Sequence, residues 1–115
     1  MTNETVNEWL KENGLSDTDI DFIETILTFT STAKMLPPKT DEINNKFQTL
    51  FPGRKAKITP YLTYQQFEKV LQDNNLSIDS HDLLNRFRSQ GMCAELCEEL
   101  LNNNIIKFFI YSPEV

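Results

Sequence analysis

Three side chains in the C-terminal part of the sequence could carry out chemistry, because thiols and an imidazole can bind metal or act as nucleophile and base. Cys93 and Cys97 are one helical turn apart, and His81 is the only histidine in the chain. Together they could supply three ligands to zinc. However, both cysteines continue an apolar stripe that includes Leu96 and Leu100, and free cysteine is among the most often buried residue types. We predict two reduced core thiols; a reactive thiol and a metal site are the alternatives.

A second group of chemically capable side chains lies between Asp73 and Asp79, where oxygen atoms recur at alternate positions as in a calcium loop of the EF-hand type. The remaining requirements of that loop are not met. The position that needs glycine for the sharp turn is Ile78, and the twelfth position, which needs a bidentate acid, is Leu84. We therefore predict turn and helix-capping roles for this segment.

No arrangement of residues matches a known catalytic pattern. A cysteine-histidine pair would again need His81, and no sequence feature orients that ring or activates either thiol. The run of Glu95, Glu98 and Glu99 falls on the solvent face of a predicted helix. Catalytic serine triads, phosphate-binding glycine loops and zinc-protease motifs are absent from the sequence. We therefore predict a non-enzymatic protein with no cofactor, no metal and no small-molecule substrate.

The charge along the chain is unevenly distributed. The 115 residues carry a formal net charge of −6. Residues 1–30 have seven acids and one base, and residues 73–115 have seven acids and three bases, whereas residues 31–72 have seven bases and three acids. The middle of this acidic chain therefore has a net charge of +4. A basic patch is the usual electrostatic footprint of a nucleic-acid contact.

The basic middle contains our candidate binding residues. Residues 63–74 have the pattern of a helix with one apolar face and one polar face, and glutamine and lysine on the polar face can hydrogen-bond to base edges. An arginine and two lysines before this helix could neutralise phosphates. The alternative is an ordinary solvated helix face, because two acids lie close by. The sequence predicts a nucleic-acid-binding site made of Arg54, Lys55, Lys57, Gln65, Lys69 and Gln72.

Start and stop signals divide the chain into six predicted helices. Ser16 and Thr40 are predicted N-caps, and Thr63 with Gln66 forms a capping box, in which two side chains satisfy two backbone N–H groups at the helix start. Residues 105–111 are rich in β-branched and aromatic side chains and are predicted to form a strand. Its partner would be residues 56–61 or a second protein chain. The predicted helix boundaries lie near Gly14, Pro37, Pro52, Asn75, Gly91 and Asn102.

Two of these predicted helices resemble parts of helix-turn-helix and winged-helix proteins. Residues 40–51 are similar to the family's second helix, and residues 63–74 are similar to its recognition helix. The connection between them is longer than the family's turn of roughly three or four residues. Small winged-helix proteins of this kind occur in bacterial mobile elements and phages. The resemblance implies an accessory subunit of a replication or transcription enzyme.

These observations predict one mainly α domain, residues 1–115, with a helix-turn-helix-like core and a short C-terminal strand. Its parts are an acidic helical segment (1–36), a basic segment (40–74) and an acidic helix pair with the strand (77–115). We expect a cytoplasmic accessory protein that binds DNA together with a protein partner. We expect no membrane contact, because no stretch approaches the roughly 18 apolar residues of a span. The alternative is a protein-interaction adaptor or inhibitor without nucleic acid contact.

Overall fold

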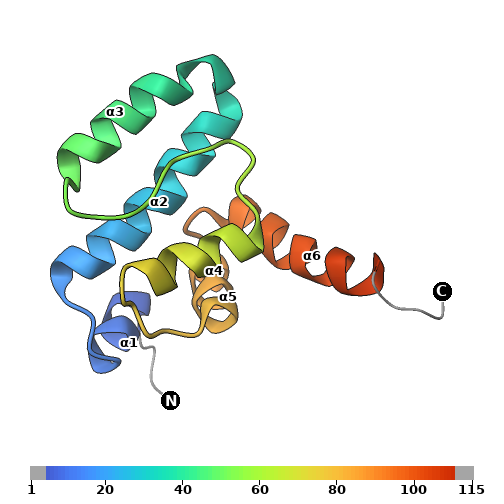
Figure 1. Ribbon diagram of the computed structural model, residues 1–115. Helices are drawn as coiled ribbons and strands as arrows, with labels where there is room; N and C mark the ends of the chain where they lie inside the picture. Colours follow the sequence, from blue (N-terminus) through green and yellow to red (C-terminus); the bar gives the residue numbers. More distant parts are fainter. Residues whose placement is uncertain (1–4, 111–115) are drawn as a thin grey trace.

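The chain folds into helices whose limits follow its capping residues and its glycine and proline positions. The computed structural model describes residues 5–110, and side chains as far as residue 102, and this part is mainly helical (Figure 1). The predicted mainly α fold is therefore confirmed. The elements are α1 (Val6–Glu12), α2 (Asp17–Met35), a 3-10 helix (Pro37–Lys39), α3 (Thr40–Leu50), α4 (Tyr64–Asp73), α5 (Ser80–Ser89) and α6 (Ala94–Ile110).

Three of the helices begin with a reciprocal capping box. At α4 the Thr63 hydroxyl accepts from the Gln66 N–H at 3.2 Å, and the Gln66 side-chain oxygen accepts from the Thr63 N–H at 2.9 Å. This pair confirms the sequence prediction. The same arrangement starts α1 and α2, so that two otherwise unpaired N–H groups are satisfied at each of these helix ends.

The predicted cap of α3 is wrong. Thr40 is the first residue of α3 and not its N-cap, and the helix has no side-chain cap. The reason is that the 3-10 turn of Pro37–Lys39 leads directly into α3. The Thr40 hydroxyl donates to the Pro37 carbonyl at 2.7 Å instead of accepting from the helix start.

The predicted C-terminal strand is also wrong. Residues 105–110 continue α6, which does not end near Asn102, and Tyr111 lies outside the described residues. β-Propensity mainly reflects how well a side chain packs on a sheet, and the described residues contain no strand for this segment to pair with. A helix satisfies its own backbone groups without any partner.

One hydrophobic core joins all six α-helices of the described part. Phe22 of α2 and Phe47 of α3 are fully buried, with ring centroids 5.8 Å apart, and Phe51 closes the cluster at 5.4 Å from Phe47. α4 packs on α5 and α6, while α1 packs on α2 and α5. Figure 1 shows α2 and α3 as an antiparallel pair beside the group formed by α4, α5 and α6. None of the helices described is both long enough and apolar enough to cross a bilayer.

Candidate functional site

Asparagine side chains form hydrogen bonds to the backbone of the segment between α3 and α4, in the way that neighbouring strands bond to a strand. Residues 54–59 contain no helix or turn. On the α3 side, Asn44 donates to the Ile58 carbonyl at 2.6 Å and accepts from the Ile58 N–H at 2.7 Å. At the other edge, Asn74 accepts from the Lys55 N–H at 2.8 Å and donates to its carbonyl at 2.9 Å. These bidentate pairs fix an extended backbone.

A third amide completes the attachment to α3, because Gln48 donates to the Ala56 carbonyl at 2.9 Å. The side chains of the segment then alternate as they do in a strand. Ala56 is half-buried and Ile58 is buried, whereas Lys55 and Lys57 are exposed. The two lysines are therefore held on the outer side of a well-fixed backbone.

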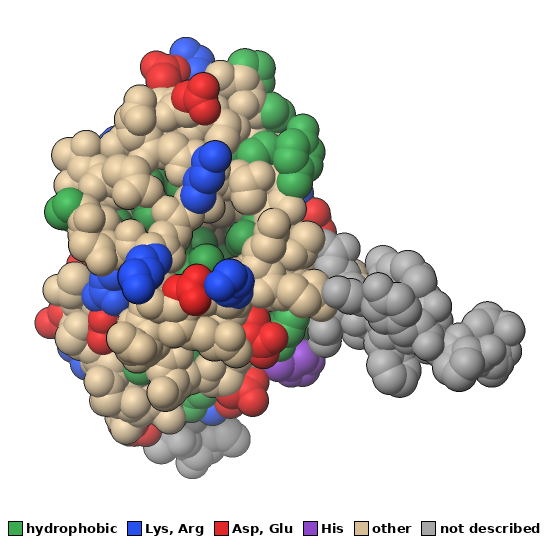
Figure 2. All heavy atoms as spheres, viewed as in Figure 1, with side chains coloured by type: hydrophobic (Ala, Val, Ile, Leu, Met, Phe, Trp, Pro, Cys, Tyr) green, Lys and Arg blue, Asp and Glu red, His purple; other side chains and the backbone are tan. Residues whose placement is uncertain are grey.

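A groove of about 700 Å³ lies between this segment, the start of α3 and α4. We name it the lysine groove, because Lys55, Lys57 and Lys69 stand along its rim. The partly exposed Ala56 and Val70 supply apolar surface inside it, and the buried Ile58 and Leu62 complete the apolar part of its lining. Figure 2 shows basic side chains on this face, with an acidic side chain among them and hydrophobic surface in the hollow between them. The other lining residues are Thr40, Asp41, Asn44, Thr59, Gln66 and Asp73.

Arg54, predicted to contact phosphate, is bound within the protein. Its guanidinium donates to the Asp19 carboxylate at 2.6 Å and lies over the Phe22 ring, 4.8 Å from the centroid. Both charged side chains are about four-fifths buried, with 19% and 22% exposed. Burial alone would raise the pKa of Asp19, but the hydrogen bonds from Arg54 and from the Ser16 N–H outweigh it and lower this pKa.

The acidic flanks neutralise other parts of the basic middle as well. Lys34 lies 2.8 Å from Glu99 of α6 and also donates to the Pro60 carbonyl at 3.2 Å. Lys69 pairs with Asp73 on its own helix at 3.2 Å, where both side chains are exposed. Within the described part of the chain, Lys55 and Lys57 form no ion pair.

The predicted polar face of α4 forms a ridge between two hollows. At roughly 100° per residue, Gln65, Lys69 and Gln72 lie within an arc of about 60°. Lys69 lines the lysine groove, Gln72 lines the hollow on the opposite side of the helix, and the exposed Gln65 lines neither. The structure thus brings together three of the six predicted site residues, namely Lys55, Lys57 and Lys69.

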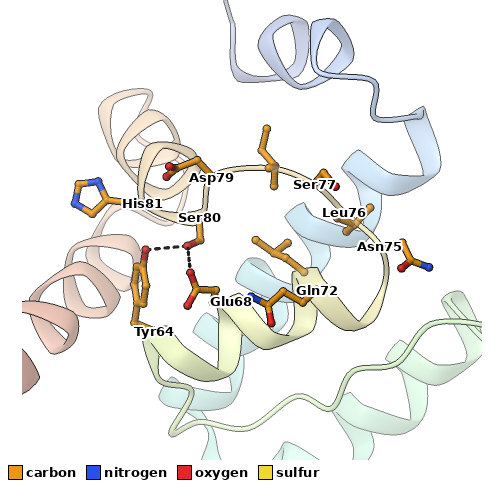
Figure 3. A pocket seen from close by; sticks show the side chains of 11 residues that line it. Tyr64, Glu68, Gln72, Asn75, Leu76, Ser77, Asp79, Ser80 and His81 are labelled. Carbon is orange, nitrogen blue, oxygen red and sulfur yellow. Dashed lines mark hydrogen bonds between the residues drawn. The ribbon is translucent and has the colours of Figure 1, made fainter.

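The hollow on the other side of α4 has a volume of about 470 Å³ and contains a polar network that sequence reasoning missed (Figure 3). The Tyr64 hydroxyl lies 2.8 Å from the buried Ser80 hydroxyl, which donates to Glu68 at 3.4 Å. Figure 3 shows His81 pointing away from Ser80, and its ring bonds to Asn85 at 3.1 Å. The Tyr64 and Glu68 contacts to Ser80 join α4 to α5 by hydrogen bonds.

The two cysteines differ in environment. Cys97 is buried as predicted, and burial, with a smaller effect of the neighbouring Cys93 thiol, raises the pKa of Cys97 to about 12. Cys93 is half-buried and packs against the core. It precedes α6 with φ 50°, so the prediction that it lies on the apolar stripe of that helix is wrong. In the part of the chain that the structure describes, no three metal-binding side chains gather at one point.

Comparisons of the chain with protein-family models, with curated proteins and with solved structures find no match. The helix-turn-helix resemblance stays a prediction from sequence. In the structure α3 packs on α2, α4 packs on α5 and α6, and residues 51–63 return along α3 before α4 begins. Function must therefore be inferred from the lysine groove itself.

Proposed function

We propose that this protein is a non-enzymatic adaptor, or inhibitory subunit, that binds a protein partner through the lysine groove. The observation that carries the proposal is the combination of an apolar interior with a rim of exposed lysines in one groove. The rim attracts an acidic partner, and the interior buries its apolar side chains. Because amide side chains fix the wall formed by residues 55–58, little order has to be gained on binding.

Two further observations favour a protein ligand over nucleic acid. Asp41 and Asp73 also line the groove, and their carboxylates would repel a phosphate backbone. Arg54, the strongest phosphate-binding residue type in the predicted site, is already paired with Asp19. An acidic peptide tolerates the same two carboxylates better, because its apolar side chains supply part of the binding energy.

Nucleic acid binding is the second candidate function, favoured by the convergence of Lys55, Lys57 and Lys69 on one groove. A DNA-binding accessory subunit would use these lysines against phosphates. Each neutralised phosphate contributes a slope of about −0.7 to −0.9 to the plot of log binding constant against log salt. Three contacts would therefore give a slope of roughly −2 to −3.

Charge reversal distinguishes these proposals. The probes are a labelled acidic peptide, Ac-(Glu-Val)3-NH2, and a labelled thymidine dodecamer, followed by fluorescence anisotropy. The double variant Lys55→Glu with Lys57→Glu should abolish peptide binding. Lys46→Glu is the matched control, because Lys46 is exposed on α3 and does not line the groove, so it should leave peptide affinity within about twofold.

Binding of the dodecamer but not the peptide, with the same dependence on Lys55 and Lys57, would replace the adaptor proposal by the DNA-binding candidate. Peptide binding that Lys46→Glu reduces as strongly as the double variant would mean that general charge attraction, and not the lysine groove, is responsible. Either result would overturn the adaptor proposal.

A further inference from the structure

The extended segment 54–59 has one backbone edge that is paired only at its beginning. In an extended chain the N–H and C=O groups of successive residues point to opposite sides. Ala56 and Ile58 bond to Gln48 and Asn44, so their backbone groups face α3. Lys55 bonds to Asn74, which follows α4. The backbone groups of Lys57 therefore point, like those of Lys55, toward α4.

Nothing in the described part of the chain pairs with this continuation of the edge. The N–H and C=O of Lys57 and of Thr59 have no hydrogen-bond partner there, and both residues line the lysine groove. The groove thus occupies the position that a neighbouring strand would take. Unpaired backbone groups along an extended edge are the template on which an added strand forms.

We propose that an extended acidic segment of the partner protein adds to the Lys57–Thr59 edge as a β-strand inside the lysine groove. The proposal rests on the adaptor function proposed above and specifies how the groove holds its ligand. Backbone hydrogen bonds to Lys57 and Thr59 give the position of the strand, and its side chains give the selectivity.

The groove also determines the sequence pattern of this ligand. Side chains of an added strand alternate between two faces. One set points into the groove toward apolar surface that includes Val70, and the other set lies level with the lysines of the rim. A ligand strand paired with this edge would lie about 4.8 Å from residues 55–59, with Lys57 on one side of it and Lys69 on the other. The matching pattern is therefore acidic residues that alternate with apolar ones.

The test compares peptides that differ only in one backbone nitrogen. Ac-(Glu-Val)3-NH2 is titrated into the ¹⁵N-labelled 115-residue protein. Two further forms of the peptide, N-methylated at one or the other of two adjacent central residues, are titrated in the same way. Since only alternate N–H groups of an edge-paired strand face its neighbour, one methylation should weaken binding at least tenfold and the other should not. Amide exchange at Lys57 should slow at least tenfold in the complex, while the amide of Lys46, which lies within α3 and outside the groove, serves as the unchanged reference.

Side-chain variants separate the backbone contribution from charge. Lys57→Ala keeps the N–H and should weaken binding only a few-fold, whereas Lys57→Pro removes the N–H and should weaken it much further. If binding depends on the lysines but both methylated peptides bind equally and Lys57 exchange is unchanged, strand addition is wrong and the adaptor function stands. If the acidic peptide fails to bind while Ac-(Lys-Val)3-NH2 or the dodecamer binds, both proposals fail.

Discussion

Removing the side chain that holds Ile58 should loosen the wall of the lysine groove. Asn44→Ala deletes both hydrogen bonds to the Ile58 backbone, of 2.6 and 2.7 Å. At about 0.5–1.5 kcal/mol for each bond, the two account for roughly 1–3 kcal/mol. The Ile58 groups are left unpaired, but they are only partly buried and water can replace part of the loss. We expect the free energy of unfolding to fall by about 1–3 kcal/mol.

That loss is a substantial share of the roughly 5–15 kcal/mol that stabilise a typical domain. It corresponds to a decrease in Tm of roughly 4–12 °C, at about 4 °C for each kcal/mol in a domain of this size. Urea unfolding followed by far-UV circular dichroism gives the free energy, and amide exchange at Ile58 gives the local effect.

Asn45→Ala is the matched control, because it makes the same chemical change one residue further along α3. The Asn45 side chain is exposed and makes no hydrogen bond to the described residues, so its loss should change stability by no more than about 0.5 kcal/mol. Equal stability of the two variants, or unchanged exchange at Ile58, would refute the inference that Asn44 fixes the groove wall.

Three further predictions concern other sites. Asp19→Asn should lower the free energy of unfolding by about 1–3 kcal/mol at neutral pH. Because the Asp19 pKa is lowered in the folded state, the difference in stability between the two proteins should disappear as pH falls through that pKa. Urea unfolding at a series of pH values measures this difference, and a difference that stays constant with pH would contradict the prediction. Thr30→Val should raise Tm by roughly 4 °C, since the Thr30 hydroxyl is buried without a hydrogen-bond partner, and a lower Tm in thermal unfolding would count against this. Iodoacetamide should label Cys93 in the native protein but Cys97 only after unfolding, as burial raises the Cys97 pKa to about 12; equal labelling by mass spectrometry would show that the thiol is accessible.

Features that depend on neighbours in sequence could be predicted. Ser16 and Thr63 start helices because their hydroxyls reach an N–H three residues away. Gly14 and Gly91 follow helix ends with φ of 92° and 78°, a conformation that glycine adopts at little cost. The strand prediction for residues 105–111 failed because the tendency of a segment to form a strand depends on a sheet elsewhere in the fold.

The candidate site was less predictable, because its geometry depends on contacts between distant residues. The sequence placed Lys55, Lys57 and Lys69 in one predicted binding site, but it did not indicate that Lys69 would stand across a groove from the other two. The bonds from Asn44 to Ile58 and from Asn74 to Lys55 join residues 14 and 19 positions apart. Such pairs form only when the packing of the helices has placed both partners, and no local propensity reports that placement.

The ion pairs that join the basic middle to the acidic flanks affect how the protein can be dissected by truncation. Arg54 is paired with Asp19 near the start of α2, and Lys34 with Glu99 in α6. A fragment limited to residues 31–72 keeps its charge of +4 but loses both of these carboxylates. In this fragment Arg54 and Lys34 would lack the carboxylates with which they are paired in the 115-residue protein. The fragment would therefore bind polyanions more strongly than that protein does. A polyanion affinity measured on such a fragment would result from the loss of the two carboxylates and would not describe the 115-residue protein.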